Sequence, residues 1–192
     1  MIHRVGILAL QGDYALHQEA LQKLNIASVL IYKPAELTDV DGLIVPGGES
    51  TALLKLMTPL HWQDAIRCFK ASGKVLFGTC AGMILFAQNV FPAQETLNLI
   101  DISVERNAYG RQLDSHVVYG ECDSAIFSVE KFEMVFIRAP KITRVGKEVT
   151  VLATSNQAPV LVQENNVVCA AFHPEMSKEN FVHAFVFQKL TR

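Results

Sequence analysis

The sequence has little net charge and lacks the glycine, cysteine and histidine patterns that identify common binding sites. Seventeen Lys and Arg residues against nineteen Asp and Glu residues give the 192 residues a net charge of −2, so no basic surface for nucleic acid or anionic membrane is expected. Gly-x-Gly-x-x-Gly and Gly-x-x-x-x-Gly-Lys motifs are absent, which disfavours a phosphate cradle. Without His-Glu-x-x-His, Cys-x-x-Cys or an acidic calcium loop, no metal site is expected either. The expected ligand is a small molecule or another protein.

Export and membrane signals are also missing. Four cysteines are scattered without pairing motifs, and a chain of this length needs no disulfides to be stable. The stretch 75–94 carries no charge over about the length that spans a bilayer. It contains Gly78, Gly82, Pro92 and several polar residues, so a buried strand followed by a helix is the better interpretation. We therefore expect no membrane span and a reducing, cytoplasmic location.

Short apolar runs alternate with helix-like segments in the first half of the chain. The runs 5–10, 27–31, 42–45 and 75–77 are continuously apolar, as strands covered on both faces should be. Apolar residues at helical spacing lie between the first two runs and between the last two. The pattern predicts an α/β fold, with a three-layer, open, mostly parallel sheet and flanking helices.

The second half predicts an additional β-rich part. Strand candidates are closely spaced after about residue 96, so some antiparallel pairing is expected. A final helix is predicted over 178–190, with Ser177 as its N-cap. Without repeats or linkers, residues 1–192 are expected to form a single domain. The strand candidates are 100–104, 133–137, 149–153, 159–163 and 167–172.

The segment 75–86 is the most informative, because an apolar strand runs into Gly-x-Cys-x-Gly and then an apolar helix. This is the pattern of a nucleophile elbow, in which Cys80 sits on a tight turn and Gly78 and Gly82 let the strand and helix approach. A helix N-terminus favours the thiolate that a cysteine nucleophile requires. The alternative is a buried structural cysteine.

Two further segments supply partners for such a cysteine. His173 follows an apolar run and precedes Pro174-Glu175, so Glu175 can accept one ring N–H while the other nitrogen serves Cys80. The segment 46–51 follows another strand, and its adjacent glycines can turn backbone N–H groups toward an oxyanion. The alternatives are a turn histidine beside a surface glutamate, and a plain turn with Ser50 as the helix N-cap.

Together, Pro46-Gly47-Gly48, Gly78-Thr79-Cys80-Ala81-Gly82 and His173-Pro174-Glu175 resemble motifs of the class I, triad-type glutamine amidotransferases. Within that family the match narrows to the glutaminase subunits of pyridoxal 5'-phosphate synthases. Mild departures from their pattern fall at Ala9, Asp13 and Met176 and touch no proposed catalytic atom. The segments that carry the closer resemblance are 8–12, 47–51, 105–112, 136–140 and 172–175.

The resemblance implies a thioester mechanism and a set of site residues. Cys80 would attack the side-chain amide of L-glutamine, and His173, oriented by Glu175, would move the proton to the leaving ammonia. The implied oxyanion donors are the main-chain N–H groups of Gly48 and Ala81. The glutamine site implied by the family comprises Gly48, Glu49, Ser50, Arg106, Ile137 and Arg138. From the residues alone, Arg106 and Arg138 would be surface arginines paired with Glu105 or Glu133.

The resemblance also implies a protein partner. The ammonia would pass to a separate synthase subunit that makes pyridoxal 5'-phosphate, since the glutaminase motifs fill this chain and leave no room for an acceptor domain. No cofactor is expected, including pyridoxal phosphate itself. A free-standing thiol hydrolase or stress protein with a related fold is the main alternative, although such proteins usually carry His where this chain has Ala81. Two further alternatives are a regulatory binding module and a glutaminase that serves an imidazole-forming synthase.

Overall fold

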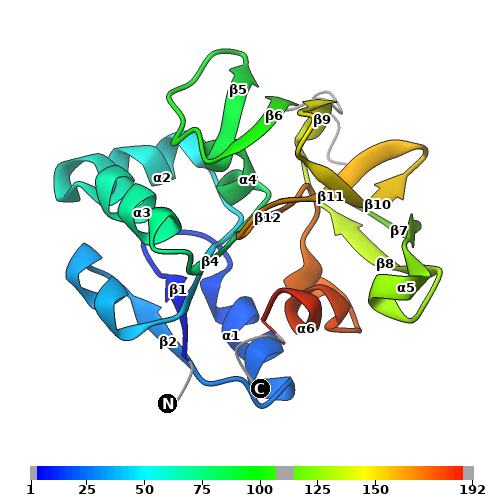
Figure 1. The fold of residues 1–192 in the computed structure, drawn as a ribbon, viewed down its shortest axis with the longest axis horizontal. Coiled ribbons are helices and arrows are strands. Elements are labelled where there is room, and N and C mark those ends of the chain that lie inside the picture. The colour runs from blue at the N-terminus through cyan, green and yellow to red at the C-terminus, as the bar shows by residue number, and fades with distance from the viewer. Residues whose placement is uncertain (1–3, 107–114, 188–192) are drawn as a thin grey trace.

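The computed structural model describes residues 4–106 and 115–187 (Figure 1). The predicted segment 105–112 therefore lies mostly outside the described residues. The helices are α1 (Tyr14–Lys23), α2 (Ser50–Met57), α3 (Trp62–Ala71), α4 (Ala81–Phe86), α5 (Ser124–Phe127) and α6 (Phe181–Phe187), with short 3-10 turns η1 (Pro34–Asp39), η2 (Thr58–Leu60) and η3 (Pro174–Met176). The strands are β1 (Val5–Leu8), β2 (Ser28–Ile31), β3 (Gly42–Val45), β4 (Val75–Thr79), β5 (Ala87–Phe91), β6 (Ile100–Glu105), β7 (His116–Cys122), β8 (Lys131–Phe136), β9 (Lys141–Val145), β10 (Thr150–Ser155), β11 (Ala158–Glu164) and β12 (Val167–Ala170).

One large sheet organises the described chain, with strand order β2-β1-β3-β4-β12-β11-β10-β7-β8. Neighbouring strands from β2 to β12 are parallel, and those from β12 to β8 are antiparallel. Every residue of β1, β3 and β12 is buried, because layers cover both faces of the parallel half. The predicted α/β class and the antiparallel, β-rich second half are confirmed.

Helices cover both faces of the parallel half (Figure 1). α1 packs on β1 and β2 and α6 on β4, while α4 packs on β3, β4 and β12 from the other side, together with α2. A smaller sheet of order β5-β6-β9 lies on that second side. The apolar core is continuous across these layers, and its largest fully buried side chains include Trp62, Phe77, Phe86, Phe172 and Phe187.

One local prediction is confirmed, one strand was not predicted, and one local prediction was wrong. The strand and helix predicted over 75–86 are β4 and α4, and α4 ends at Phe86. Strand β5, which follows directly and pairs with β6, was not predicted. Ser177 does not cap the final helix, because its hydroxyl donates to the Glu133 carbonyl at 2.9 Å and α6 begins only at Phe181. Residues 188–190 of that predicted helix lie outside the described range. No helix in the described part of the chain is long and apolar enough to cross a membrane.

Close packing of α4 on β3 yields a stability prediction. A Cβ at Gly82 would lie 2.0 Å from the Val45 carbonyl oxygen, so Gly82→Ala should lower the free energy of unfolding by about 3 kcal/mol in urea denaturation. Gly73→Ala is the matched control, because no atom lies within 4 Å of its added Cβ although φ is +78°. Only about 1 kcal/mol is expected there. Equal losses in the two variants would contradict the packing argument.

Candidate functional site

Three chain segments meet because the strands before them are adjacent and in parallel register. Val45 at the end of β3 pairs with Gly78, and Thr79 at the end of β4 pairs with Ala170 at the end of β12. The carboxyl ends of these strands therefore lead, side by side, into 46–49, Cys80 and 171–175. This edge of an open α/β sheet is where such folds place their chemistry.

Cys80 has a backbone conformation that residues other than glycine rarely adopt. Its φ is 48° and ψ is −101°, and its N–H donates to the Ala170 carbonyl at 2.9 Å. A Cβ at Gly78 would lie 2.8 Å from the backbone carbon of Gly82, so the flanking glycines are required for the turn to close. The strain falls on Cys80, as the Gly-x-Cys-x-Gly pattern predicts.

His173 and Glu175 form the pair that the sequence predicts. His173 Nδ1 lies 2.7 Å from Glu175 Oε1, and both side chains are almost fully buried. Burial alone would lower the pKa of His173, but its interactions with Cys80 and Glu175 outweigh burial and raise the pKa to about 10. Burial would raise the pKa of Glu175, whereas its interactions with His17 and His173 bring it well below the ordinary range. The Nδ1 bond leaves His173 Nε2 for a proton of the cysteine thiol.

The glycine segment lies directly against this pair. A Cβ at Gly47 would lie 2.5 Å from His173 Cε1 and in ordinary contact, at 3.4 Å, with Cys80 Cβ, so only glycine leaves room for the His173 ring. Gly48 has a φ of +146°. The N-cap of α2 is Glu49, whose carboxylate accepts from the N–H groups of Thr51 and Ala52, and Ser50 is the first helical residue. The alternative in which Ser50 caps the helix is therefore wrong.

A cavity of about 420 Å³ opens over Cys80 and His173. Six predicted substrate-site residues line it, namely Gly48, Glu49, Ser50, Arg106, Ile137 and Arg138. Glu175 lies behind His173 rather than in the cavity wall, and Ala81 directly follows Cys80 at the start of α4.

Neither arginine forms the surface ion pair that residue types alone allow. Arg106 Nη1 donates to Gln94 Oε1, which also accepts from the Ser50 hydroxyl at 2.9 Å. Arg138, with a φ of 44°, forms no hydrogen bond or ion pair with another described residue. Glu133 instead binds Lys178. Both arginines line the cavity, and neither forms an ion pair with a carboxylate of another described residue, although Arg106 lies close enough to lower the pKa of Glu49.

Several lining residues were not predicted. Gln11 accepts from the Glu49 N–H at 3.1 Å, and Asp13 Oδ2 lies 3.7 Å from His173 Nδ1. Ile84 and Met176 complete the wall. Gln11 and Gly12 belong to the segment 8–12 that carries the family resemblance, which is the signal that could have found them. Gln94 contacts Ser50 and Arg106 only through the tertiary structure, so no sequence motif indicates these contacts.

One cluster has the spacing of metal ligands. Single ligand atoms of Asp13, His173 and Glu175 lie within 4.8 Å of one another. However, the Nδ1 atom of His173 already bonds Glu175 Oε1 at 2.7 Å, so the geometry suits a base and its orienting carboxylate better than a metal. The remaining cysteines are free, and burial raises the pKa of the Cys169 thiol, which favours its protonated form.

A cysteine on a strand-to-helix turn, beside a histidine bonded to a glutamate at the edge of a parallel sheet, is the arrangement of the triad-type glutamine amidotransferases. The model of the SNO glutamine amidotransferase family matches residues 7–191. The chain belongs to this family.

Relatives and solved structures agree with this assignment. The pyridoxal 5'-phosphate synthase subunit PdxT of Thermosipho africanus is 43% identical over 185 residues, covering 95% of this chain and 96% of that protein. The subunit of the same name from Haemophilus influenzae is 43% identical over 187 residues, covering 95% of each chain. A crystal structure of a glutamine amidotransferase superposes with a TM-score of 0.90 at 39% identity, covering 98% of this chain and 99% of that one. PurLQS from Thermotoga maritima shares the fold, with a TM-score of 0.75 at 15% identity and coverage of 99% and 100%.

The His173–Glu175 bond makes the pKa of His173 a direct test of the site. Glu175→Gln should lower that pKa from about 10 toward or below the ordinary 6.5, because burial then opposes the charged ring with less compensation. NMR titration of the imidazole Cε1–H, assigned with His173→Asn, measures it.

The same shift has a consequence for stability. Because folding raises the pKa of His173, the contribution of this residue to the free energy of unfolding is complete below about pH 6.5 and is lost as the pH rises through about 10.

The control for the His173 titration is Glu121→Gln, which changes an exposed carboxylate on β7 that contacts Lys131 and should leave the pKa of His173 unchanged. An unchanged pKa in Glu175→Gln would contradict the described geometry.

Proposed function

We propose that this chain hydrolyses L-glutamine to L-glutamate and ammonia through a Cys80–His173–Glu175 triad. Cys80 first passes its thiol proton to His173, whose raised pKa favours the imidazolium. Cys80 Sγ then attacks the amide carbon, and His173 gives the proton to the leaving ammonia. Water, deprotonated by His173, hydrolyses the γ-glutamyl thioester and releases glutamate. The observation that carries the proposal is the strained Cys80 turn, packed through Gly47 against a His173 ring bonded to Glu175 at 2.7 Å.

Main-chain N–H groups of Gly48 and Ala81 are the proposed oxyanion donors. Neither group donates to another described residue, so both are available to a developing negative oxygen. Ala81 directly follows the nucleophile, and the Gly47–Gly48 segment lies against Cys80 from β3. Two donors from separate loops can hold the tetrahedral intermediate that forms between them.

Glutamine recognition is assigned to the cavity residues Gly48, Glu49, Ser50, Arg106, Ile137 and Arg138. An α-carboxylate calls for a cation, which Arg106 or Arg138 supplies without first breaking an ion pair. Glu49 supplies a negative charge for the α-ammonium. Partial desolvation opposes that charge, but hydrogen bonds from Thr51 and Ala52 and the nearby Arg106 bring its pKa below the ordinary value. A cavity lined by both a carboxylate and guanidinium groups fits a zwitterionic amino acid.

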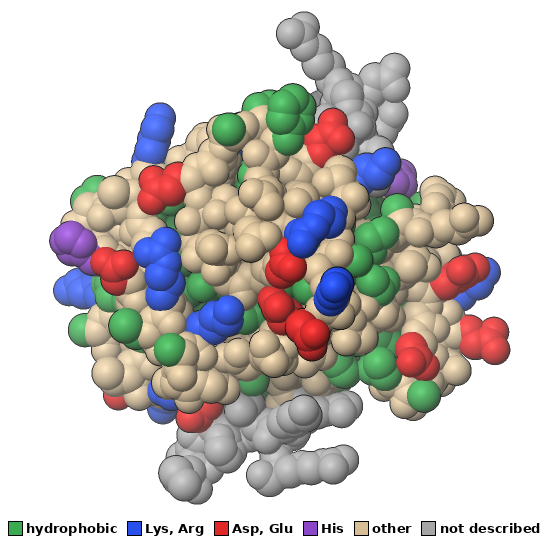
Figure 2. Space-filling model, turned by 45° about the horizontal axis from the view of Figure 1, so that its top comes forward, with side chains coloured by type: hydrophobic (Ala, Val, Ile, Leu, Met, Phe, Trp, Pro, Cys, Tyr) green, Lys and Arg blue, Asp and Glu red, His purple; other side chains and the backbone are tan. Residues whose placement is uncertain are grey.

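The ammonia acceptor is proposed to be the synthase subunit of pyridoxal 5'-phosphate synthase. This proposal follows the names of the relatives and the extent of the family match, which covers residues 7–191. Residues 1–192 would then act as one glutaminase domain in a reducing cytoplasm, with no cofactor of its own. On the face in Figure 2, Lys and Arg side chains are interspersed with Asp and Glu, a distribution that favours a protein partner over nucleic acid.

Release of free ammonia should depend on that partner. The chain alone is expected to release ammonia from glutamine slowly, and at least 10-fold faster once the synthase subunit is added, since ammonia made without an acceptor is wasted. A coupled glutamate dehydrogenase assay measures it. Cys80→Ala should abolish release in both conditions, whereas Cys68→Ala, an exposed cysteine on α3, should not change it. Full activity in Cys80→Ala would remove the assigned nucleophile, and equal rates with and without the partner would refute gating.

Arg106 provides a test of substrate recognition. Arg106→Gln should raise KM for glutamine at least 10-fold, the loss of about 1.4 kcal/mol expected for a charged hydrogen bond to the substrate. kcat should change less, because the guanidinium does not touch the reacting amide. Steady-state kinetics with the synthase subunit present separate the two constants. Arg4→Gln, an exposed residue before β1, is the control, and a KM equal to the control's would exclude Arg106 from the glutamine site.

A further inference from the structure

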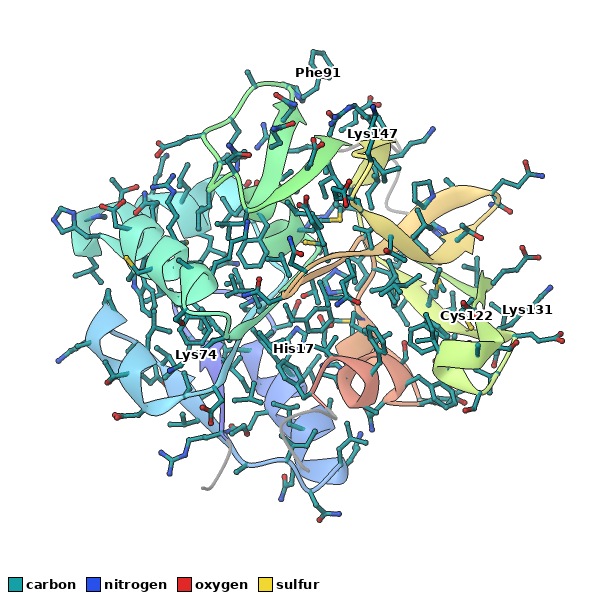
Figure 3. The ribbon with its side chains drawn as sticks, in the orientation of Figure 1. His17, Lys74, Phe91, Cys122, Lys131 and Lys147 are labelled. Atoms are coloured by element: carbon teal, nitrogen blue, oxygen red, sulfur yellow. The ribbon has the colours of Figure 1, made fainter. Side chains whose placement is uncertain are left out.

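Two buried histidines that the proposed mechanism does not use lie behind the triad. His17 on α1 and His183 on α6 are fully buried, on the face of the sheet opposite α4. Figure 3 shows His17 in the interior of the molecule. His17 Nδ1 lies 2.9 Å from His183 Nε2, and His17 Nε2 lies 3.2 Å from Thr79 Oγ1 at the end of β4. These contacts place His17 beside the last residue of β4, directly before Cys80.

His17 also faces the triad carboxylate. His17 Nε2 lies 3.4 Å from Glu175 Oε2, and both side chains are completely buried. Glu175 Oε1 is used by His173, whereas Oε2 accepts no hydrogen bond of good geometry from any described residue. A buried carboxylate oxygen without a donor is costly. His17 Nε2, which lies 3.2 Å from Thr79 Oγ1 and 3.4 Å from this oxygen, is placed to supply that donor after a small reorientation of the ring.

The charge on Glu175 determines which ring nitrogens of His17 and His183 carry protons. Burial lowers the pKa of His17 and lowers that of His183 to about 3, so both rings are neutral at neutral pH. A lone pair of His17 Nε2 facing a carboxylate would be repelled, so Nε2 carries the proton and Nδ1 does not. His17 Nδ1 must then accept from His183 Nε2–H. The remaining nitrogen, His183 Nδ1, is buried and has no hydrogen-bond partner among the described residues, so it is assigned as the unprotonated nitrogen of that ring.

We propose that His17 is a positioning residue of the triad, whose Nε2–H holds Glu175 ionised and oriented toward His173, while His183 fixes the tautomer of His17. The proposal deepens the glutaminase function and rests on it. His17 touches neither substrate nor thiol, so its effect passes through Glu175 to His173. Titratable groups that face this unit are Asp13, His17, His173, Glu175 and His183.

The test compares His17→Leu, which removes the donor, with His17→Gln, which keeps an amide N–H close to the place of Nε2. In the complex with the synthase subunit, His17→Leu should lower kcat about 10-fold, the size of effect seen for groups that orient a catalytic ligand. KM for glutamine should stay within two-fold, because the cavity wall is unchanged. The acid limb of the kcat/KM profile should move to higher pH, because Glu175 loses a donor to its charged form. His17→Gln should restore most of kcat and return the acid limb most of the way to its wild-type pH.

A matched control separates positioning from stability. Leu21→Ala removes a fully buried side chain one turn further along α1 and should lower the melting temperature without moving kcat or the acid limb. His183→Phe removes only the donor to His17 and should shift the acid limb in the same direction by less. A His17→Leu profile that matches wild type or Leu21→Ala would overturn the proposal.

A measurement that needs no turnover keeps the two claims apart. Carbon NMR titration of the Glu175 carboxyl in the isolated chain should give a higher pKa in His17→Leu than in wild type, with His17→Gln between them. A wild-type complex that releases no ammonia would refute the proposed function while leaving this titration interpretable. An unchanged Glu175 titration in a folded His17→Leu variant would refute the role of His17 even where the enzyme is active.

Discussion

The site depends on the parallel register of β3, β4 and β12. Each strand contributes one loop, and pairing of Val45 with Gly78 and of Thr79 with Ala170 places the three loops at the same height on the sheet edge. A slip of one residue in β4 would turn the side chains of that strand to the opposite face. The turn at Cys80 would then lose its bond to Ala170 and its contact with Gly47. Burial of all three strands on both faces makes such a slip expensive, so core packing holds the reactive groups in place.

Glycine is required where these three loops, and the loop after β1 that contains Gly12, approach their neighbours. Added Cβ atoms would clash at Gly47 with the His173 ring, at Gly12 with the Gly47 carbonyl oxygen, and at Gly82 with the Val45 carbonyl oxygen. The backbone at these glycines therefore contacts another backbone segment or a catalytic side chain directly, with no side chain between them. This closeness lets a short turn hold Cys80 at a positive φ, because the surrounding contacts leave it no relaxed alternative.

The sequence predicted those parts of the structure that local chemistry dictates. Continuous apolar runs identified the parallel strands, and Gly-x-Cys-x-Gly and His-Pro-Glu identified the residues that the structure brings together at their ends. Strand β5 was missed because Gln88 and Asn89 are exposed and only pairing with β6 makes the segment a strand. The cap of α2 was placed one residue late because Glu49 and Ser50 both have capping side chains, and the N–H of Glu49 is held by Gln11 from a distant loop. His17 was indistinguishable from a core residue, since its buried position on α1 says nothing of a partner 158 positions away.

Burial of Glu175 imposes opposing requirements on the triad. Removing the Glu175 carboxylate from water strengthens its hydrogen bond to His173 and stabilises a protonated imidazole. Desolvation also favours the neutral carboxylic acid, which would no longer stabilise that imidazolium. A lysine at this point would keep Glu175 ionised at the cost of its effect on His173, because a second cation would share the carboxylate and lower the pKa of the imidazole. Neutral histidines avoid this conflict. His17 and His183 present N–H dipoles without a net charge, so the carboxylate is stabilised and its full charge remains directed at His173.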